Sequence, residues 1–168
     1  MSQPTPTSDA HPLPTHKGLG PPATSDTMVV GHDGSKAADN GLAVALDLAA
    51  KTGAPLLVVR SWTVDTAPHG LLFKSGYVAS FDEVSAEIEV KLERELRPVL
   101  QAHPAVPVEF RAAFGHASEV LIKLSADAMM LVVGSRGRGG FASLMLGSSS
   151  EQVVRHATCP VLVVRPRK

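Results

Sequence analysis

The chain has 168 residues, 44% hydrophobic and 19% charged, and its 16 Lys and Arg residues balance 16 Asp and Glu residues. This length suits one domain with a substantial core. The balanced charge argues against nucleic acid or an anionic membrane surface as partner, the apolar runs are too short for a membrane span, and the single cysteine excludes an internal disulfide.

The first 26 residues differ from the rest in composition. They are rich in Pro, Thr, Ser and Gly and contain only two leucines. Such a segment buries too little apolar surface to offset its ordering entropy. We therefore expect a disordered tail at 1–26 and a folded domain at 27–168. The tail has neither the basic nor the apolar region of a secretory signal, which indicates a cytoplasmic location.

Apolar runs alternate with helical periodicities along the rest of the chain. Ser35 is a predicted helix cap, Gly53 ends that helix, and Ser80 with Glu83 forms a capping box. Strands are predicted at 28–31, 56–59, 106–112, 128–133 and 161–164, and helices at 35–53, 80–100, 117–125 and from Ser148 through Val154. Residues 62–79 lack periodicity and are predicted as a long loop.

This alternation of strands and helices predicts βαβ units and a parallel sheet covered on both faces. Sheets of this kind bind ligands beyond the carboxyl ends of their strands, where the strand order reverses. No internal repeat is present, which favours a single domain.

Residues 134–148, GSRGRGGFASLMLGS, follow a buried strand and lead into a helix with a predicted capping box of Ser148 and Glu151. A helix N-terminus offers unpaired N–H groups and a positive dipole end. The glycines would admit a phosphate, and Arg136 and Arg138 suggest an anionic ligand. The alternative is a surface loop with ordinary turn glycines. Glu151 would compete with a phosphate for the same donors.

Two common nucleotide motifs do not account for this loop. The Walker pattern is absent, and the formal G-x-G-x-x-A match lacks the acidic residue expected about 20 positions later. The spacing of Gly134, Gly137 and Gly147-Ser148 instead fits G-x2-G-x9-G-[ST]. With VVGHDGS at 29–35 and HATCPVLVVRP at 156–166, it resembles the signature of the universal stress protein family over residues 28–166.

The resemblance implies a single-domain, three-layer α/β/α sandwich with a five-stranded parallel sheet of order 3-2-1-4-5, a Rossmann-like fold of the adenine nucleotide alpha hydrolase type. It also implies ATP binding, with Mg²⁺ on the phosphates, and commonly a homodimer. The family's site residues correspond by position to Asp33, Val59, Gly134, Gly137, Arg138, Gly147, Ser148 and Ser149.

The resemblance also implies roles for these residues. The glycines and Ser148 would form a phosphate and ribose loop, Arg138 and the Ser149 backbone would contact phosphates, Asp33 would lie against the nucleotide, and the Val59 backbone would pair with adenine. Asp33 could instead only form an Asx turn, and Val59 could be plain core. His32 departs from the usual apolar or tyrosine choice, and its role stays open. The histidines do not show a metal-ligand spacing, so the sequence predicts no protein metal ligands.

The function favoured by these residues is ATP-dependent regulation in a stress response. Cyclic AMP is an alternative ligand. A slow ATPase or a self-phosphorylating enzyme is an alternative activity, although no evident general base accompanies the loop. The apolar fifth strand at 161–164 would form an open sheet edge, which favours a homodimer through that strand.

Overall fold

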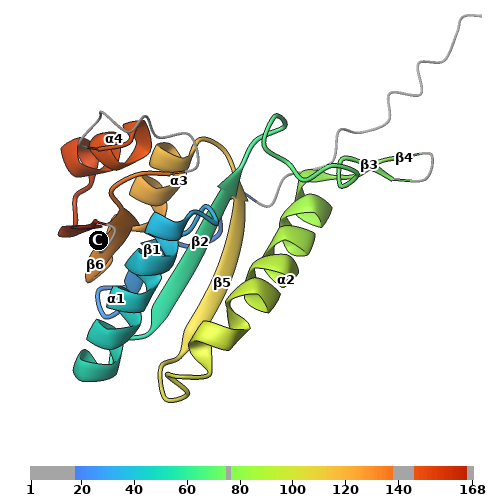
Figure 1. The fold of residues 1–168 in the computed structure, drawn as a ribbon. Coiled ribbons are helices and arrows are strands. Elements are labelled where there is room, and N and C mark those ends of the chain that lie inside the picture. The colour runs from blue at the N-terminus through green and yellow to red at the C-terminus, as the bar shows by residue number, and fades with distance from the viewer. Residues whose placement is uncertain (1–17, 75–76, 138–145, 166–168) are drawn as a thin grey trace, which may run out of the picture.

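A computed structural model describes residues 18–74, 77–137 and 146–165 of the protein. Its elements in chain order are β1 (Met28–Gly31), α1 (Lys36–Thr52), β2 (Leu56–Trp62), β3 (Phe73–Lys74), β4 (Tyr77–Val78), α2 (Phe81–Leu100), β5 (Val108–Phe114), α3 (Ala117–Leu124), β6 (Met130–Gly134), α4 (Ser148–His156) and β7 (Val161–Val164). Figure 1 shows their arrangement.

Five of the strands form one parallel sheet in the order β5-β2-β1-β6-β7. Numbered along the chain within this sheet, the order is 3-2-1-4-5, as expected. The order reverses at β1, because β2 pairs with one of its edges and β6 with the other. The predicted α/β class and its parallel sheet are confirmed.

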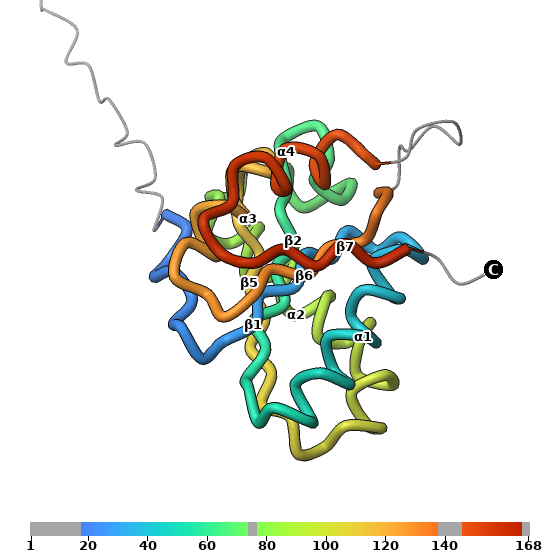
Figure 2. Tube along the Cα trace, turned by 90° about the vertical axis from the view of Figure 1, so that its left-hand side faces the viewer, coloured from blue at the N-terminus to red at the C-terminus, as the bar shows by residue number. Residues whose placement is uncertain are grey.

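Helices cover both faces of the sheet, and each face has its own core. Alternating residues of β1 divide between the two cores: Val29 packs with α3 and α4, whereas Val30 packs with α1 and α2. Both valines are fully buried. Figure 2, turned by 90° from Figure 1, shows α3 and α4 on one side of the strands and α1 and α2 on the other.

The segment predicted as a loop from 62 to 79 contains ordered structure at both ends. Trp62 is the last residue of β2 and pairs with Phe114 at the end of β5. Their rings lie 5.0 Å apart between centroids, and Phe81 stacks on Phe114 at 4.3 Å. This aromatic cluster lengthens β2 and shifts β5 towards the C-terminus relative to prediction. Farther along, β3 and β4 form a short antiparallel pair.

The boundary of the folded part lies earlier than expected. Residues 1–17 of the predicted tail fall outside the described residues, but Leu19 and Ala23 pack against the domain, whereas most of 18–26 is exposed. The Ala23 N–H donates to the Leu124 carbonyl at 2.7 Å, and Ala23 is 6% exposed. Leu19 packs against the core beneath α3 and α4. Composition alone missed these contacts because their partners lie about 100 residues away in the chain.

Two of the three predicted side-chain caps at helix starts are confirmed. The Ser35 hydroxyl accepts from Ala38, and the capping box of Ser80 and Glu83 has both of its hydrogen bonds. The predicted box of Ser148 and Glu151 is wrong. Gly147 is the N-cap of α4, and no side chain caps this helix.

Candidate functional site

A pocket of about 470 Å³ opens beyond the carboxyl ends of β1 and β6, where the strand order reverses. In Figure 1 this is the upper end of the sheet, towards which the β2 arrow points. The volume lies in the range of small-molecule sites, and the position is the one where open parallel sheets bind ligands. Its lining residues are Gly31, His32, Asp33, Ala38, Val59, Ser61, Ala117, Leu121, Val133, Gly134, Arg136, Gly137, Leu146, Gly147, Ser148, Ser149 and Ser150.

The structure brings seven of the eight predicted site residues to this pocket. They are Asp33, Val59, Gly134, Gly137, Gly147, Ser148 and Ser149. The eighth, Arg138, lies outside the described residues.

The three loop glycines serve different purposes. A Cβ at Gly134 would lie 2.8 Å from the main-chain carbon and oxygen of Ala37, so this glycine is required for packing against α1. A Cβ at Gly137 would lie 2.6 Å from Asp33 Oδ2, so the missing side chain lets the loop approach that carboxylate. At Gly147 the nearest atom would be 3.5 Å away, and φ is −73°. Gly147 is therefore unstrained, and a Cβ there would make ordinary contacts with the backbone of residues 135–137.

The N-terminus of α4 presents main-chain donors to the pocket. Gly147, Ser148 and Ser149 all line it, and the first N–H groups of a helix have no partner within the helix. The Ser150 hydroxyl donates to the Gly134 carbonyl at 2.7 Å, which ties the helix start to the end of β6. The expected competition from Glu151 is not found, because its carboxylate accepts from Arg155 at 2.8 Å.

Arg136 also lines the pocket. The sequence suggested an anionic ligand from its charge, but Arg136 was not among the predicted site residues. Its Nε atom is buried and has no hydrogen-bond partner among the described residues. A buried donor without a partner is costly, and a charged one more so. A guanidinium placed beside free helix N–H groups can bind an anion through several charge-assisted hydrogen bonds.

On the other side of the pocket, Asp33 follows β1. Its Oδ1 accepts from the Ser35 N–H at 2.9 Å, which is the Asx turn given above as the alternative. Its Oδ2 lies next to Gly137. The carboxylate therefore shapes the turn and lines the pocket at the same time.

Val59 was predicted to end its strand, but β2 continues to Trp62. Its carbonyl accepts from the His32 N–H at 2.9 Å, so this backbone group is used within the sheet. Main-chain groups alternate in direction along a strand, and those of Ser61 therefore face the same edge as those of Val59. Since β1 ends at Gly31, Ser61 has its polar backbone at the pocket. Sequence reasoning missed Ser61 because it placed the end of the strand too early.

Apolar residues complete the pocket between these polar sides. Leu121 and Ala117 come from α3, and Val133 comes from β6. Among the residues that the structure describes, no group of three or more His, Cys, Asp or Glu could hold a metal ion. The described helices include none that is long and apolar enough to cross a membrane.

The fold and the pocket place the chain among α/β proteins with a pocket at the switch point of a parallel sheet. The sequence model of the universal stress protein family matches residues 24–165. Universal stress proteins of Mycobacterium tuberculosis and Mycobacterium bovis are each 36% identical over 141 residues, which is 82% of this chain and 45% of theirs. The chain belongs to the universal stress protein family, and it spans less than half the length of these relatives.

Solved structures show the same fold. The universal stress protein UspA from Lactobacillus plantarum aligns with a TM-score of 0.64 at 20% identity, covering 85% of this chain and 99% of that one. A universal stress protein crystallised in complex with cAMP aligns with a TM-score of 0.61 at 26% identity, covering 86% of this chain and 100% of that one.

Proposed function

We propose that the protein binds an adenine nucleotide in this pocket, with ATP as the ligand, and acts as a nucleotide-dependent regulatory protein in a stress response. The observation that carries the proposal is the buried Arg136 Nε, which has no hydrogen-bond partner among the described residues and belongs to the same pocket as the N-terminus of α4. Both groups favour an anion, and they meet at one end of a pocket of nucleotide size.

The phosphates would lie on the Gly147–Ser149 segment, where the N–H groups of Ser148 and Ser149 and the Arg136 guanidinium can donate to them. The absence of a side-chain cap on α4 supports this arrangement, because a phosphate would then supply the missing acceptor. ATP brings Mg²⁺ on its own phosphates, and we assign the ion no protein ligand.

The adenine would lie at the other end, between β2 and α3. Leu121 and Val133 offer apolar contacts there, and the Ser61 backbone offers a donor and an acceptor for the base edge. We therefore replace Val59 with Ser61 as the backbone partner of adenine. Asp33 would accept from the nucleoside, as the family resemblance implies.

Cyclic AMP is a second candidate ligand. The structural relative that carries cAMP is 26% identical and covers nearly the whole domain. A cyclic monophosphate would satisfy the same donors with a single phosphate. Arg136 and the open α4 N-terminus together provide more donors than one phosphate uses, which favours ATP.

Calorimetric titrations of ATP, ADP, cAMP and adenosine test the proposal. We expect ATP to bind most tightly. Arg136→Ala should weaken ATP by about tenfold, the loss of a hydrogen bond to a charged group, and should leave adenosine nearly unchanged. Arg136→Lys keeps the charge but loses the planar fork, so its effect should be intermediate. Binding of cAMP but not ATP would reverse the ligand assignment, and no binding of any of the four would refute the site.

We also propose that two copies associate through β7. This strand is at one edge of the sheet, and its side chains are half-buried. The Pro160 carbonyl accepts from Leu131 of β6, and the Val164 carbonyl from Ser135 just after β6. The Val163 N–H therefore faces the open edge. Val163→Pro should abolish association, whereas Val163→Thr should preserve it. Sedimentation showing a native monomer at all concentrations would contradict the dimer.

A further inference from the structure

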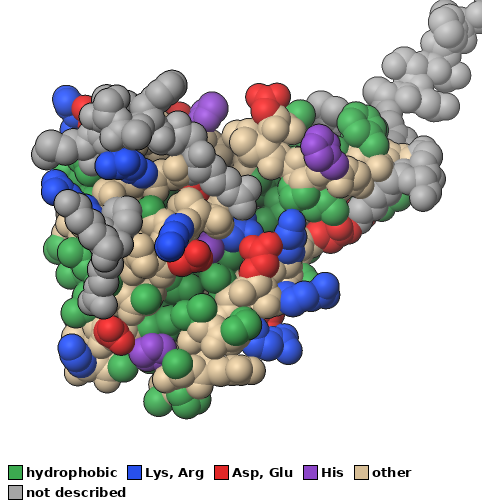
Figure 3. Space-filling model, in the orientation of Figure 1, with side chains coloured by type: hydrophobic (Ala, Val, Ile, Leu, Met, Phe, Trp, Pro, Cys, Tyr) green, Lys and Arg blue, Asp and Glu red, His purple; other side chains and the backbone are tan. Residues whose placement is uncertain are grey.

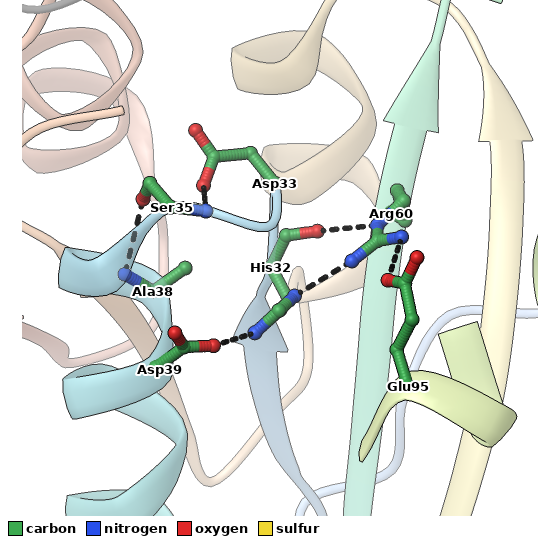
Figure 4. Close-up of polar contacts among 7 residues, drawn as sticks. All are labelled: His32, Asp33, Ser35, Ala38, Asp39, Arg60 and Glu95. Atoms are coloured by element: carbon green, nitrogen blue, oxygen red, sulfur yellow. Dashed lines mark hydrogen bonds and ion pairs between the residues drawn. The ribbon is translucent and has the colours of Figure 1, made fainter. Parts of the chain in front are cut away.

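A chain of four polar side chains runs beside the pocket, on the side of the sheet that α1 and α2 cover. His32 Nε2 lies 3.0 Å from Asp39 Oδ1, and His32 Nδ1 lies 3.0 Å from Arg60 Nη2. Arg60 Nη1 continues the chain by donating to Glu95 Oε2 at 2.7 Å. Figure 4 shows these contacts running from α1 through the end of β1 and β2 to α2. His32, near the centre, is 3% exposed.

The chemistry of arginine fixes the proton on His32. A guanidinium can only donate, so Nδ1 of the imidazole must accept from Arg60. The remaining proton is then on Nε2 and is donated to Asp39. This arrangement requires a neutral imidazole. A second proton on Nδ1 would set two donors against each other at 3.0 Å.

Arg60 also holds the main chain that leads into the pocket. Its Nε donates to the His32 carbonyl at 3.1 Å, and this carbonyl belongs to the peptide that joins His32 to Asp33. One guanidinium therefore fixes both the ring and the peptide immediately before Asp33. The Asp33 carboxylate in turn accepts from Ser35 and lies beside Gly137.

We propose that His32 is a positioning residue: in its neutral form it holds Arg60 on the peptide before Asp33, and its protonation releases this clamp and weakens nucleoside binding. The effect on binding rests on the proposed function, whereas the effect on the Asp33 turn does not. Acid would thus loosen the turn after β1 that lines the pocket.

The surroundings favour the neutral form. Burial lowers the pKa of His32 most, and the charge of Arg60 acts in the same direction, while Asp39 and Asp33 oppose it by raising the pKa. These groups face His32 from α1, β2 and the turn after β1, and Glu95 of α2 reaches it only through Arg60. Acidic and basic side chains also lie next to one another near the middle of this face in Figure 3. A second arrangement is available in acid, with protonated His32 on Asp39 and Arg60 on Glu95.

The proposal is tested first without a ligand. Nuclear magnetic resonance would follow protonation of the His32 ring and the hydrogen-exchange protection of the Ser35 amide, which donates to Asp33, between about pH 8 and pH 5, on either side of the ordinary histidine pKa. We expect the protection of Ser35 to fall with the same midpoint as His32. In Asp39→Asn this midpoint should move to lower pH, because Asp39 raises the pKa of His32.

The second measurement is the affinity for adenosine, which has no phosphate to titrate. In the native protein it should weaken by about tenfold on acidification, the loss of a hydrogen bond to a charged group. His32→Asn keeps an acceptor near Arg60 but does not titrate, so its affinity should stop falling in acid. His32→Leu removes the acceptor and should bind weakly at every pH. His103→Asn, remote from the pocket, is the matched control and should retain the native pH profile.

Protection of Ser35 that does not follow His32 would overturn the proposal, whether or not a nucleotide binds. If acid weakens adenosine binding equally in the native protein and in His32→Asn, the proposed effect of His32 on binding is wrong. If no nucleoside binds at any pH while the protection of the Ser35 amide still follows the protonation of His32, the clamp stands and the proposed function fails.

Discussion

The two sides of the pocket differ in how far the protein satisfies its own polar groups. The Asp33 side, residues 32–35, is held by hydrogen bonds to Val59, Arg60, Asp39 and Ser35. The glycine-loop side, residues 134–137 and 146–150, has a helix that no described side chain caps and a buried Arg136 Nε without a described partner. One side is preorganised by the protein, and the other leaves donors for an anion. A ligand would therefore stabilise mainly the glycine-loop side.

The largest expected effect is on stability, and it distinguishes two glycines of the glycine-loop side, Gly134 and Gly147. Gly134→Ala places a Cβ 2.8 Å from main-chain atoms of Ala37, which cannot move without shifting α1. We expect the free energy of unfolding to fall by about 1–3 kcal/mol, as for other overpacked sites. Gly147→Ala is the control, because its Cβ has ordinary contacts and should change stability by less than about 0.5 kcal/mol. Denaturant unfolding measures both, and equal losses would remove the distinction between packing and ligand-facing glycines.

The next effect concerns affinity. Gly147→Val places a branched side chain at the N-terminus of α4 without backbone strain, since φ is −73°. It should weaken ATP by at least about tenfold, or about 1.4 kcal/mol, and adenosine much less. Calorimetry decides between these outcomes. Unchanged ATP affinity would show that the phosphates do not lie on the glycine-loop side.

A smaller effect concerns the N-terminal segment beneath α3. Removal of residues 1–17 should leave the unfolding midpoint unchanged, because their sequence, rich in Pro, Thr and Ser, offers little apolar surface to bury. Removal of 1–25 deletes the packing of Leu19 and Ala23 and the hydrogen bond to Leu124 at the end of α3. We expect this longer truncation to cost about 1–2 kcal/mol. Equal thermal unfolding of the two truncated proteins would restore the sequence-based boundary at Thr27.

The smallest expected effect is the pH dependence of stability from the Asp33 side. Because the folded protein lowers the pKa of His32 from its ordinary value of 6.5, the unfolded chain takes up a proton first as pH falls. The stability from neutral His32 is complete above pH 6.5 and is lost as pH falls towards the folded pKa. The difference in unfolding free energy between the native protein and His32→Asn should show this decline. A difference that does not change with pH would mean that His32 does not resist protonation.

Several features of the protein were determined by local sequence. Apolar runs located the strands of the main sheet, and Ser35, Ser80 and Gly53 set helix ends, because caps depend on residues within one turn. The glycine spacing located one side of the pocket. Seven of eight predicted site residues line that pocket, and the eighth lies outside the described residues.

Tertiary structure alone decided the features that depend on distant partners. Trp62 extends β2 because Phe114 and Phe81 pack against it, and this extension brings the Ser61 backbone to the pocket beside Val59. Arg60 reaches His32 across 28 residues of chain. Gly147 takes the capping position that Ser148 was expected to hold, because the Gly147 N–H bonds the Ser135 carbonyl at 2.8 Å. Periodicity and capping rules describe a residue's near neighbours in the chain, whereas these contacts exist only once the strands are placed side by side.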